Sequence, residues 1–263
     1  MTDDLDTALD WLGRPVDCAA CAHRDRLADE RCQPRHACIH DRYAKRIQRF
    51  FEGNPETAGE HLDHPYFEVR STAVRFAPIF LITRLMEDPD ETVRASVARR
   101  LPRRLLLRMR ADPDREVRIA VASRLEEADL APLMRDADYA VRLRVARRAP
   151  EGMLPAMMHD EDPEVRLEVA RRVGLEWLTS MAWDDSARVR IAVAQRLPAE
   201  KLSALVRDPD WCVRYAVASR IDPDDLEPLT HDPVDEVRAA ARERRAAAPP
   251  APPFTTLDRR GEP

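Results

Sequence analysis

Four cysteines near the start of the chain carry the clearest chemistry in the sequence. Cys18, Cys21, Cys32 and Cys38 follow the spacing C-x₂-C-x₁₀-C-x₅-C. Two cysteines three residues apart can bind one metal ion, and two more from a following loop complete a tetrahedral set of thiolates. Four soft ligands restrict the bound group to zinc or an iron–sulfur cluster. The spacing alone leaves these two alternatives open.

Other polar residues near this motif could assist it. His23, His36 and His40 lie within or beside it, and imidazole also binds metals, but four thiols already complete the set. We therefore expect the three histidines to surround the site without binding metal. Lys45 and the nearby arginines are expected to offset the negative charge of a thiolate-held cluster. The fifth cysteine, Cys212, is expected to be a lone thiol on a polar face.

The rest of the chain is organised by a repeat of 24 residues. The repeat is anchored by a valine, which returns as Val69, Val93, Val117, Val141, Val165, Val189, Val213 and Val237. Arginine follows every one of these valines, and from the second repeat onward an aspartate stands five residues before each. A fixed period without insertions is typical of a solenoid, in which each unit buries its apolar face against its neighbours.

Residues 88–102, DPDETVRASVARRLP, show what each repeat is expected to fold into. The Asp-Pro pair should open a helix, because the carboxylate caps free N–H groups and proline suits the first helical position. Val97 and Leu101 then continue an apolar stripe, and the closing proline should stop the helix. Leu106 and Met109, three residues apart, predict one short 3₁₀ or α turn. Alternating Val/Ile/Thr runs are missing, so we expect an all-α fold without strands.

Two rows of arginine run through the repeats. The first row follows the valines: Arg70, Arg94, Arg118, Arg142, Arg166, Arg190, Arg214 and Arg238. It lies within the apolar stripe, where an unpaired charge is costly, so we predict a ladder with aspartates of the same or an adjacent repeat. The second row is Arg100, Arg124, Arg148, Arg172, Arg196, Arg220 and Arg244. We expect it to be a solvated face, with anion, nucleic-acid or protein docking as the alternative.

The segments that flank the repeats define the expected domains. Residues 5–12 predict a short amphipathic helix with Leu5, Ala8, Leu9 and Leu12 on one face. Residues 41–51 predict another, with Tyr43, Ile47, Phe50 and Phe51 on one face, ended by Gly53-Asn54-Pro55. We expect a cysteine-rich domain over 1–60, eight repeats over 64–245 with the last truncated, and a disordered Pro-rich tail over 246–263.

Composition narrows the class of protein. The formal charge of −5 on 263 residues gives no general affinity for nucleic acid. No apolar run reaches the roughly 18 residues of a membrane span, and the acidic start MTDDLDTALD is unlike a signal or transit peptide. We therefore expect a cytoplasmic protein without a membrane partner. In that compartment clustered cysteines indicate metal ligands rather than disulfides.

The repeat resembles the leucine-rich repeat variant, whose 24-residue unit has the form DPdxxVRxxVAxRLPxxxLxxLxx. DPDETVRASVARRLPRRLLLRMRA (88–111) and DPDREVRIAVASRLEEADLAPLMR (112–135) match it closely, and the resemblance covers residues 64 to about 245. It implies alternating α and 3₁₀ helices stacked as a right-handed superhelical solenoid without a sheet. The N-terminal segment resembles the four-cysteine module that precedes such repeats. That resemblance implies a [4Fe–4S] cluster bound by Cys18, Cys21, Cys32 and Cys38, with zinc as the alternative.

The sequence gives no basis for assigning an enzymatic activity. Six glycines provide no phosphate loop, and no G-x-S-x-G or H-E-x-x-H motif is present. We therefore expect a non-enzymatic protein-interaction solenoid that carries a [4Fe–4S] cluster. One alternative is electron transfer by the cluster with the solenoid as the docking surface. Another is nucleic-acid binding along the arginine rows, which the repeated aspartates and the net negative charge count against. The sequence identifies neither the protein partner nor the oligomeric state.

Overall fold

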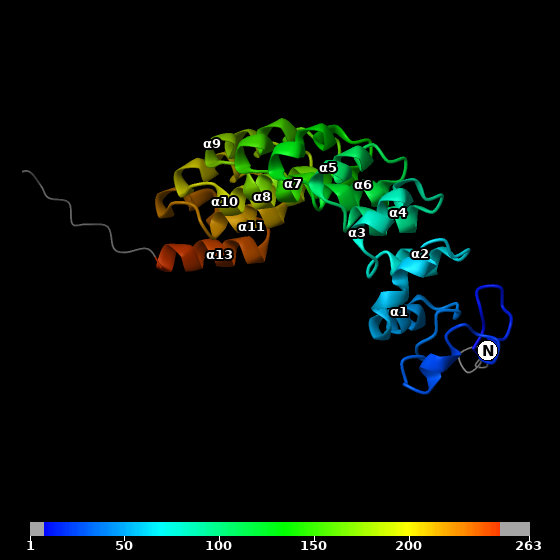
Figure 1. Ribbon diagram of the computed structural model, residues 1–263. Helices are drawn as coiled ribbons and strands as arrows, with labels where there is room; N and C mark the ends of the chain where they lie inside the picture. The colour runs from blue at the N-terminus through cyan, green and yellow to red at the C-terminus, as the bar shows by residue number, and fades with distance from the viewer. Residues whose placement is uncertain (1–7, 248–263) are drawn as a thin grey trace, which may run out of the picture. The chain divides into compact units, whose positions relative to one another are not determined.

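The computed structural model describes residues 8–247 (Figure 1). The chain divides into two compact units, one up to Ala149 and one from Pro150. Residues 8–247 contain no strand, only isolated bridges between Leu9 and Pro15 and between Gln33 and Ala37. The predicted all-α fold is confirmed. The predicted tail from residue 248 onward lies outside the described residues, and the boundary near residue 60 stays a prediction.

The first unit holds the cysteine-rich segment and the early repeats. The cysteine-rich segment contains η1 (Arg24–Leu27), α1 (Ala44–Gly53) and η2 (Pro55–His61). The repeat helices are α2 (Phe67–Ala73), α4 (Glu91–Ala98), α6 (Arg115–Ala122) and α7 (Tyr139–Arg148). Short pieces join them: α3 (Ile79–Ile82), η3 (Thr83–Glu87), α5 (Arg103–Leu106), η4 (Leu107–Met109), η5 (Glu127–Asp129) and η6 (Ala131–Arg135). From α1 through α7, each of the longer helices packs against the next.

The second unit repeats the same arrangement. Its long helices are α8 (Pro163–Arg172), α10 (Ala187–Arg196), α11 (Trp211–Ala218) and α13 (Asp235–Ala246), and they lie side by side in this order (Figure 1). The short pieces are η7 (Glu151–Met157), α9 (Leu175–Leu178), η8 (Thr179–Met181), η9 (Ala199–Leu205), η10 (Pro223–Asp225) and α12 (Glu227–Thr230). The predicted alternation of one longer helix with short helical structure is confirmed, but most connections contain two short pieces where one was expected.

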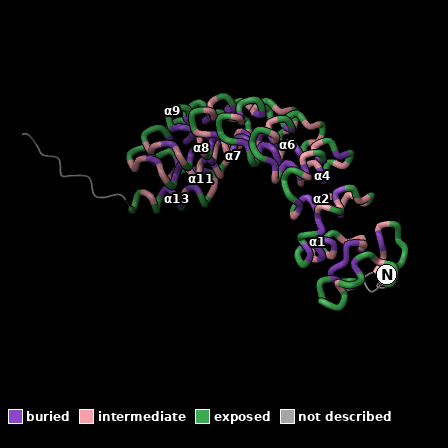
Figure 2. Tube along the Cα trace, viewed as in Figure 1, coloured by how far each residue is buried: buried purple, intermediate pink, exposed green. Residues whose placement is uncertain are grey.

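The core follows the repeat. All eight anchoring valines are fully buried, and so are Val97 and Leu101 of the predicted stripe. Leu106 and Met109 close the core from the short helical piece. Buried residues follow the helices, and exposed ones gather in the connections (Figure 2). Each unit therefore buries its apolar residues between successive helices, as expected of a stacked repeat.

The helices begin two residues later than predicted. The cap of α4 is Asp90, whose carboxylate accepts the N–H of Thr92 at 2.9 Å, and not Asp88. The corresponding caps in other repeats are Asp114, Asp138, Asp162 and Asp210. The carboxylate of Asp88 instead accepts Arg70 of the preceding repeat and the N–H of Asp90, ahead of the first helical residue. Pro163, shifted two places along its repeat, does begin its helix.

The first arginine row forms the predicted ladder. Arg94 donates from Nε and Nη2 to the carboxylate of Asp112 at 2.9 and 3.0 Å, and from Nη1 to the carbonyl of Asp88 at 2.8 Å. Each arginine thus ties the start of its own repeat to the aspartate of the next. The same bidentate pairing joins Arg70 to Asp88, Arg118 to Asp136, Arg166 to Asp184, Arg190 to Asp208 and Arg214 to Asp232.

The second arginine row has a structural role that the prediction of a solvated face did not include. Arg124 donates from Nη1 to the carbonyls of Ala98 and Leu101 at 3.0 and 2.7 Å, at the end of the preceding helix α4. These carbonyls have no partner within the helix, and a cation there also suits the helix dipole. The same contact to the preceding repeat is made by Arg100, Arg148, Arg196, Arg220 and Arg244. Both rows therefore bind acceptors of the chain itself, which counts against the nucleic-acid alternative.

The N-terminal segment differs in part from its prediction. The helix predicted over 41–51 is present as α1, ends at Gly53 as expected, and buries Ile47, Phe50 and Phe51. The helix predicted over 5–12 is wrong in its described part. There the Asp10 carboxylate accepts the N–H groups of Leu12 and Arg14 at 2.9 Å and so holds a turn. Leu5 lies outside the described residues.

Over residues 8–247, no helix has both the length and the apolar character needed to cross a bilayer.

Candidate metal centre

Local backbone contacts gather the four cysteines in the first unit. Cys18 and Cys21 lie in the loop before η1, where the Asp17 carboxylate accepts the N–H groups of Ala19 and Ala20 at 2.8 and 3.2 Å. This Asx-type turn bends the chain between the two thiols. Cys32 follows η1, and its N–H donates to the carbonyl of Arg26 at 3.2 Å. Its loop is thereby fixed onto η1.

A tight reversal returns the chain from Cys32 to Cys38. Gln33 and Ala37 exchange two backbone hydrogen bonds of 2.8 Å, which closes the loop between these cysteines. Arg35, at the tip of the loop, has a φ of 65°, a left-handed conformation that costs free energy in a non-glycine residue. The N–H of Cys38 then donates to the carbonyl of Arg46 in α1 at 3.2 Å. The loop is thus held closed although its backbone is strained.

The four thiols are free and close enough to affect one another. Cys32 and Cys38 are buried, with 5% and 3% of their surface exposed, whereas Cys18 and Cys21 are half-buried. A hydrogen bond between the two buried thiols lowers the pKa of Cys32 and, together with burial, raises the pKa of Cys38. Burial and then the charges of Cys38 and Cys21 raise the pKa of Cys18. Each of the four sequence-predicted ligands therefore acts on the others.

Backbone N–H groups are directed at two of the sulfur atoms. The N–H of His23 donates to Sγ of Cys21 at 3.4 Å, and the N–H of His40 donates to the Cys38 sulfur and lowers the pKa of Cys38. In both cases the donor stands two residues after the cysteine. Such bonds favour the thiolate form that a metal requires, and they tune the potential of iron–sulfur clusters.

One N–H group of Arg26, which lies near the cysteines, is buried and lacks an acceptor. Arg26 donates from Nη1 to Asn54 and Glu56 at 2.7 Å each, yet its Nε is buried without any hydrogen-bond partner among the described residues. The charge of Arg26 also contributes to lowering the pKa of Cys32. An unpaired buried donor is costly, and a negatively charged cluster is the kind of group that would offset it. Lys45, by contrast, is exposed on α1.

The donor set suits a thiolate-bound metal group. Among residues 8–247, no three or more His, Cys, Asp or Glu side chains stand in a metal-holding arrangement. The fit therefore rests on chemistry, namely four free interacting thiols, N–H donors at two sulfurs and one buried arginine N–H without an acceptor. Soft sulfur ligands of this number suit an iron–sulfur cluster or zinc.

Four histidines, of which His23 is buried and the others half-buried, form a group of their own that the sequence analysis missed. Nε2 of His23 lies 3.1 Å from Nε2 of His61, and His40 and His64 extend the group. Burial and then the neighbouring histidines lower the pKa of His61 to about 4, so this ring is neutral near pH 7. His61 lies between the cysteine-rich segment and the repeats, and His64 takes the place of the ladder aspartate in the first repeat. His36 is exposed beside Arg49.

The fifth cysteine lies far from the other four in the sequence and belongs to the second unit. Cys212 lies near the start of α11 in the second unit, half-buried, and its N–H donates to the Asp210 cap at 2.8 Å. It has no part in the cysteine-rich segment.

Comparisons with known proteins give the family. The family model described as "LRV protein FeS4 cluster" matches residues 8–60. The model for the leucine rich repeat variant matches residues 91–114, 139–162 and 187–210. The second match places tandem repeats across both units, and the first covers all four clustered cysteines.

Similar proteins agree with these matches. A curated relative, an uncharacterised 27.7 kDa protein in the nifB 3′ region of Rhodobacter capsulatus, is 50% identical over 82 residues, which is 31% of this chain and 34% of the relative. A solved structure described as a leucine-rich repeat variant with a novel repetitive structural motif is 42% identical, with a TM-score of 0.82. That match covers 87% of this chain and 98% of the other. The chain belongs to the leucine-rich repeat variant family, and its N-terminal segment matches the iron–sulfur cluster module of that family.

Proposed function

We propose that Cys18, Cys21, Cys32 and Cys38 hold one [4Fe–4S] cluster, and that the repeats form a protein-binding scaffold attached to it. The observation that supports the first part is that the four thiols are free of disulfides and act electrostatically on one another, with Arg26 acting on Cys32. The match to a module described by an FeS4 cluster supports the four-iron form over zinc. The repeats offer extended faces of the kind on which solenoids bind partners.

The protein groups around the cluster have distinct roles in this proposal. Cys32 and Cys38 shield one side from water because both are buried, and the N–H groups of His23 and His40 favour thiolates at Cys21 and Cys38. Arg26 offsets negative charge beside Cys32. When bound, a cluster of this kind supplies one-electron exchange. We propose no catalytic residue, and we propose a reducing cytoplasmic setting, where free thiols persist.

Metal and sulfide analysis of the anaerobically purified protein tests the cluster. We expect about four iron atoms and about four acid-labile sulfides per chain, with a broad visible absorption. Cys32→Ser should lose the iron, whereas the matched Cys212→Ser should keep it because Cys212 lies outside the module. One zinc per chain without sulfide would overturn the proposal in favour of a structural zinc site.

Electron transfer is a second candidate, favoured by the exposure of two ligands. Cys18 and Cys21 are half-buried, and Cys21 lines a surface pocket of about 350 Å³ together with Trp11, Asp17 and His40. A cluster whose ligands reach the surface can exchange electrons with a docked protein. Reversible one-electron reduction, followed by electron paramagnetic resonance and accelerated by a partner, is the expected result. A cluster that resists reduction before it breaks down would contradict this candidate.

A further inference from the structure

The repeat pattern changes around Asp184 on the surface of the second unit. Proline follows the ladder aspartate in four repeats, whereas Ala137, Glu161 and Asp185 take its place in three consecutive ones. The residue before Asp184 is Trp183, whose surface is 74% exposed, where the neighbouring repeats place His159 and Arg207. Neither Trp183 nor Asp185 contributes to the buried core, because both are exposed. An exposed indole of this kind serves recognition better than stability.

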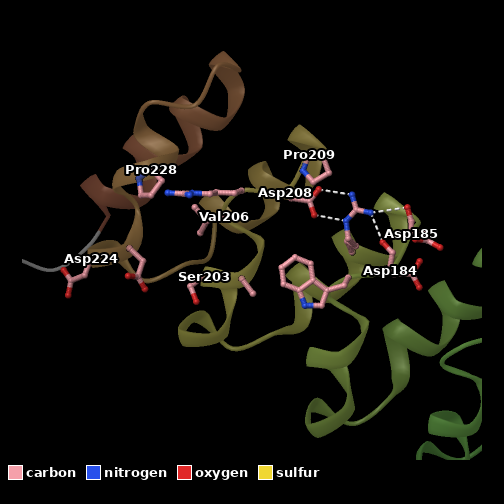
Figure 3. A pocket seen from close by; sticks show the side chains of 13 residues that line it. Asp184, Asp185, Ser203, Val206, Asp208, Pro209, Asp224 and Pro228 are labelled. Carbon is pink, nitrogen blue, oxygen red and sulfur yellow. Dashed lines mark hydrogen bonds and ion pairs between the residues drawn. The ribbon is translucent and has the colours of Figure 1, made fainter.

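These residues line a groove of about 770 Å³. Figure 3 shows Asp224 on one side of it, Asp184 and Asp185 on the other, and Ser203 and Val206 between them. Trp183 also lines the groove, and Pro209 and Pro228 give it further apolar surface. The groove therefore combines an aromatic face, an apolar floor and carboxylates at opposite sides.

A second, smaller groove repeats the first at an interval of one repeat. It has a volume of about 300 Å³ and shares Trp183, Asp184 and Asp185 with the larger one. Asp160 and Arg166 line it where Asp184 and Arg190, 24 residues later, line the larger groove. Trp183 thus stands between two similar sites in tandem.

The free charges in the larger groove are mainly negative. Asp184 and Asp208 are bound by the ladder arginines Arg166 and Arg190. Within residues 8–247, the exposed carboxylates of Asp185, Asp224 and Asp225 have no hydrogen-bond or ion-pair partner, and Arg207 is the opposing cation that lines the groove. Phosphate groups would be repelled here, whereas a guanidinium would be attracted.

We propose that this groove binds an extended, arginine-containing segment of a partner protein, an inference that rests on the proposed role of the repeats as a protein-binding scaffold. The guanidinium stacks on the Trp183 indole and pairs with Asp185, because arginine combines a flat cation with bidentate donors. Its aliphatic part lies along Val206 and Pro209. The carboxylates of Asp224 and Asp225 attract a second basic group or the amino end of the segment.

The repeat spacing sets the expected motif. Packed helices lie about 8–10 Å apart, and a chain in the polyproline II conformation advances about 3.1 Å per residue with three residues per turn. A polyproline II segment that crosses from one groove to the next therefore presents every third side chain to equivalent sites. Two arginines separated by two residues, Arg-x-x-Arg, fit the tandem grooves, and Trp183 lies between them.

Fluorescence anisotropy with the full-length, metal-loaded protein tests the proposal. The probe is a labelled nine-residue peptide with one Arg-x-x-Arg motif, compared with the same peptide carrying glutamates and with a labelled single-stranded oligonucleotide. We expect only the arginine peptide to bind, with affinity that falls as salt rises. Trp183→Ala should weaken binding about tenfold, since it removes the stacking surface. Asp185→Pro, which restores the usual repeat residue, should also weaken it.

The matched control is Trp211→Ala, which removes an indole of 44% exposure that does not line either groove. It should leave peptide affinity unchanged. Circular dichroism and iron content of each variant show that folding and the cluster are retained. Absence of binding to the wild-type protein, equal binding to Trp183→Ala, or preference for the oligonucleotide would overturn the proposal. Loss of iron with peptide binding intact would refute the cluster and leave the groove assignment standing.

Discussion

The cysteine-rich segment and the repeats satisfy their polar groups in opposite ways. In the repeats, six ladder arginines bind the aspartate of the next repeat, and six arginines of the second row bind carbonyls of the preceding one. In the cysteine-rich segment, four thiols remain free and Arg26 keeps a buried N–H without an acceptor. Regular charges in a repeat protein are thus structural, whereas unsatisfied groups in an irregular segment indicate a ligand.

Removing the metal should destabilise the cysteine-rich segment far more than the repeats, which is the largest of the expected effects. The loops that carry Cys18 to Cys38 contain little regular structure, so their stability is expected to depend on the bound group. After chelation under reducing conditions, amide hydrogen exchange should accelerate strongly over residues 17–41 and little in α10 and α11. Equal acceleration in both regions would show that the repeats also depend on the metal.

Breaking one arginine–aspartate pair of the ladder should have the next largest effect, a loss in the free energy of unfolding. Asp208→Ala leaves the partly buried Arg190 without its carboxylate and is expected to lower the free energy of unfolding by about 3 kcal/mol. Replacing both partners, Arg190→Met with Asp208→Leu, should recover most of this loss. The control Asp63→Ala breaks an exposed pair with Arg84 and should cost under about 1 kcal/mol. Urea unfolding measures all three, and equal losses at Asp208 and Asp63 would contradict the account.

A smaller loss is expected from the second arginine row. Arg124→Ala removes the donor to two helix-end carbonyls, and we expect a loss of about 1–2 kcal/mol in the free energy of unfolding. Arg108→Ala, an exposed arginine on the neighbouring turn, should change it by less than about 0.5 kcal/mol. If both variants unfold at the same urea concentration, Arg124 does not cap the preceding helix in solution.

Mild acid should destabilise the region around His61 and leave the repeats unchanged. This is the smallest of the expected effects. The folded pKa of His61 is lowered to about 4, so the unfolded chain takes up a proton first and stability near His61 falls as pH drops from about 6.5 to about 4. The hydrogen bond from Arg214 lowers the pKa of Asp232, so that pair stabilises the fold above about pH 4 and weakens only below it.

Hydrogen exchange at pH 7 and pH 5 measures this difference. After correction for the intrinsic exchange rate at each pH, protection over η2 is expected to fall at pH 5, with the protection of α11 and α13 unchanged. His61→Gln should remove the pH response of η2, whereas the exposed His159→Gln should not. A response of equal size in both regions would contradict the role given to His61.

The repeats were predictable because their contacts recur at a fixed spacing. The 24-residue period was enough to predict the buried valines, the short helical pieces and the arginine–aspartate ladder. The helix starts were missed by two residues because Asp88 serves the ladder and leaves the cap to Asp90. The role of the second row was missed because its acceptors belong to the preceding helix, which the pattern of a single helix does not reveal.

The metal centre was predictable only as a set of ligands. The spacing of four cysteines indicated a thiolate site, and the structure shows those thiols interacting. Arg26 contacts Asn54, and His23 contacts His61, across long stretches of sequence. No local motif predicts these contacts. The turn at Asp10 was missed because a side-chain acceptor replaced the helical hydrogen bonds.

Mössbauer spectroscopy of the anaerobically purified protein, enriched in the Mössbauer isotope of iron, tests the central claim most directly. The account predicts that essentially all iron belongs to one cubane cluster of four irons, and that Cys38→Ser abolishes its signal while Cys212→Ser preserves it. A protein that contains no iron, or whose cluster survives the loss of Cys38, would contradict the assignment of these four cysteines.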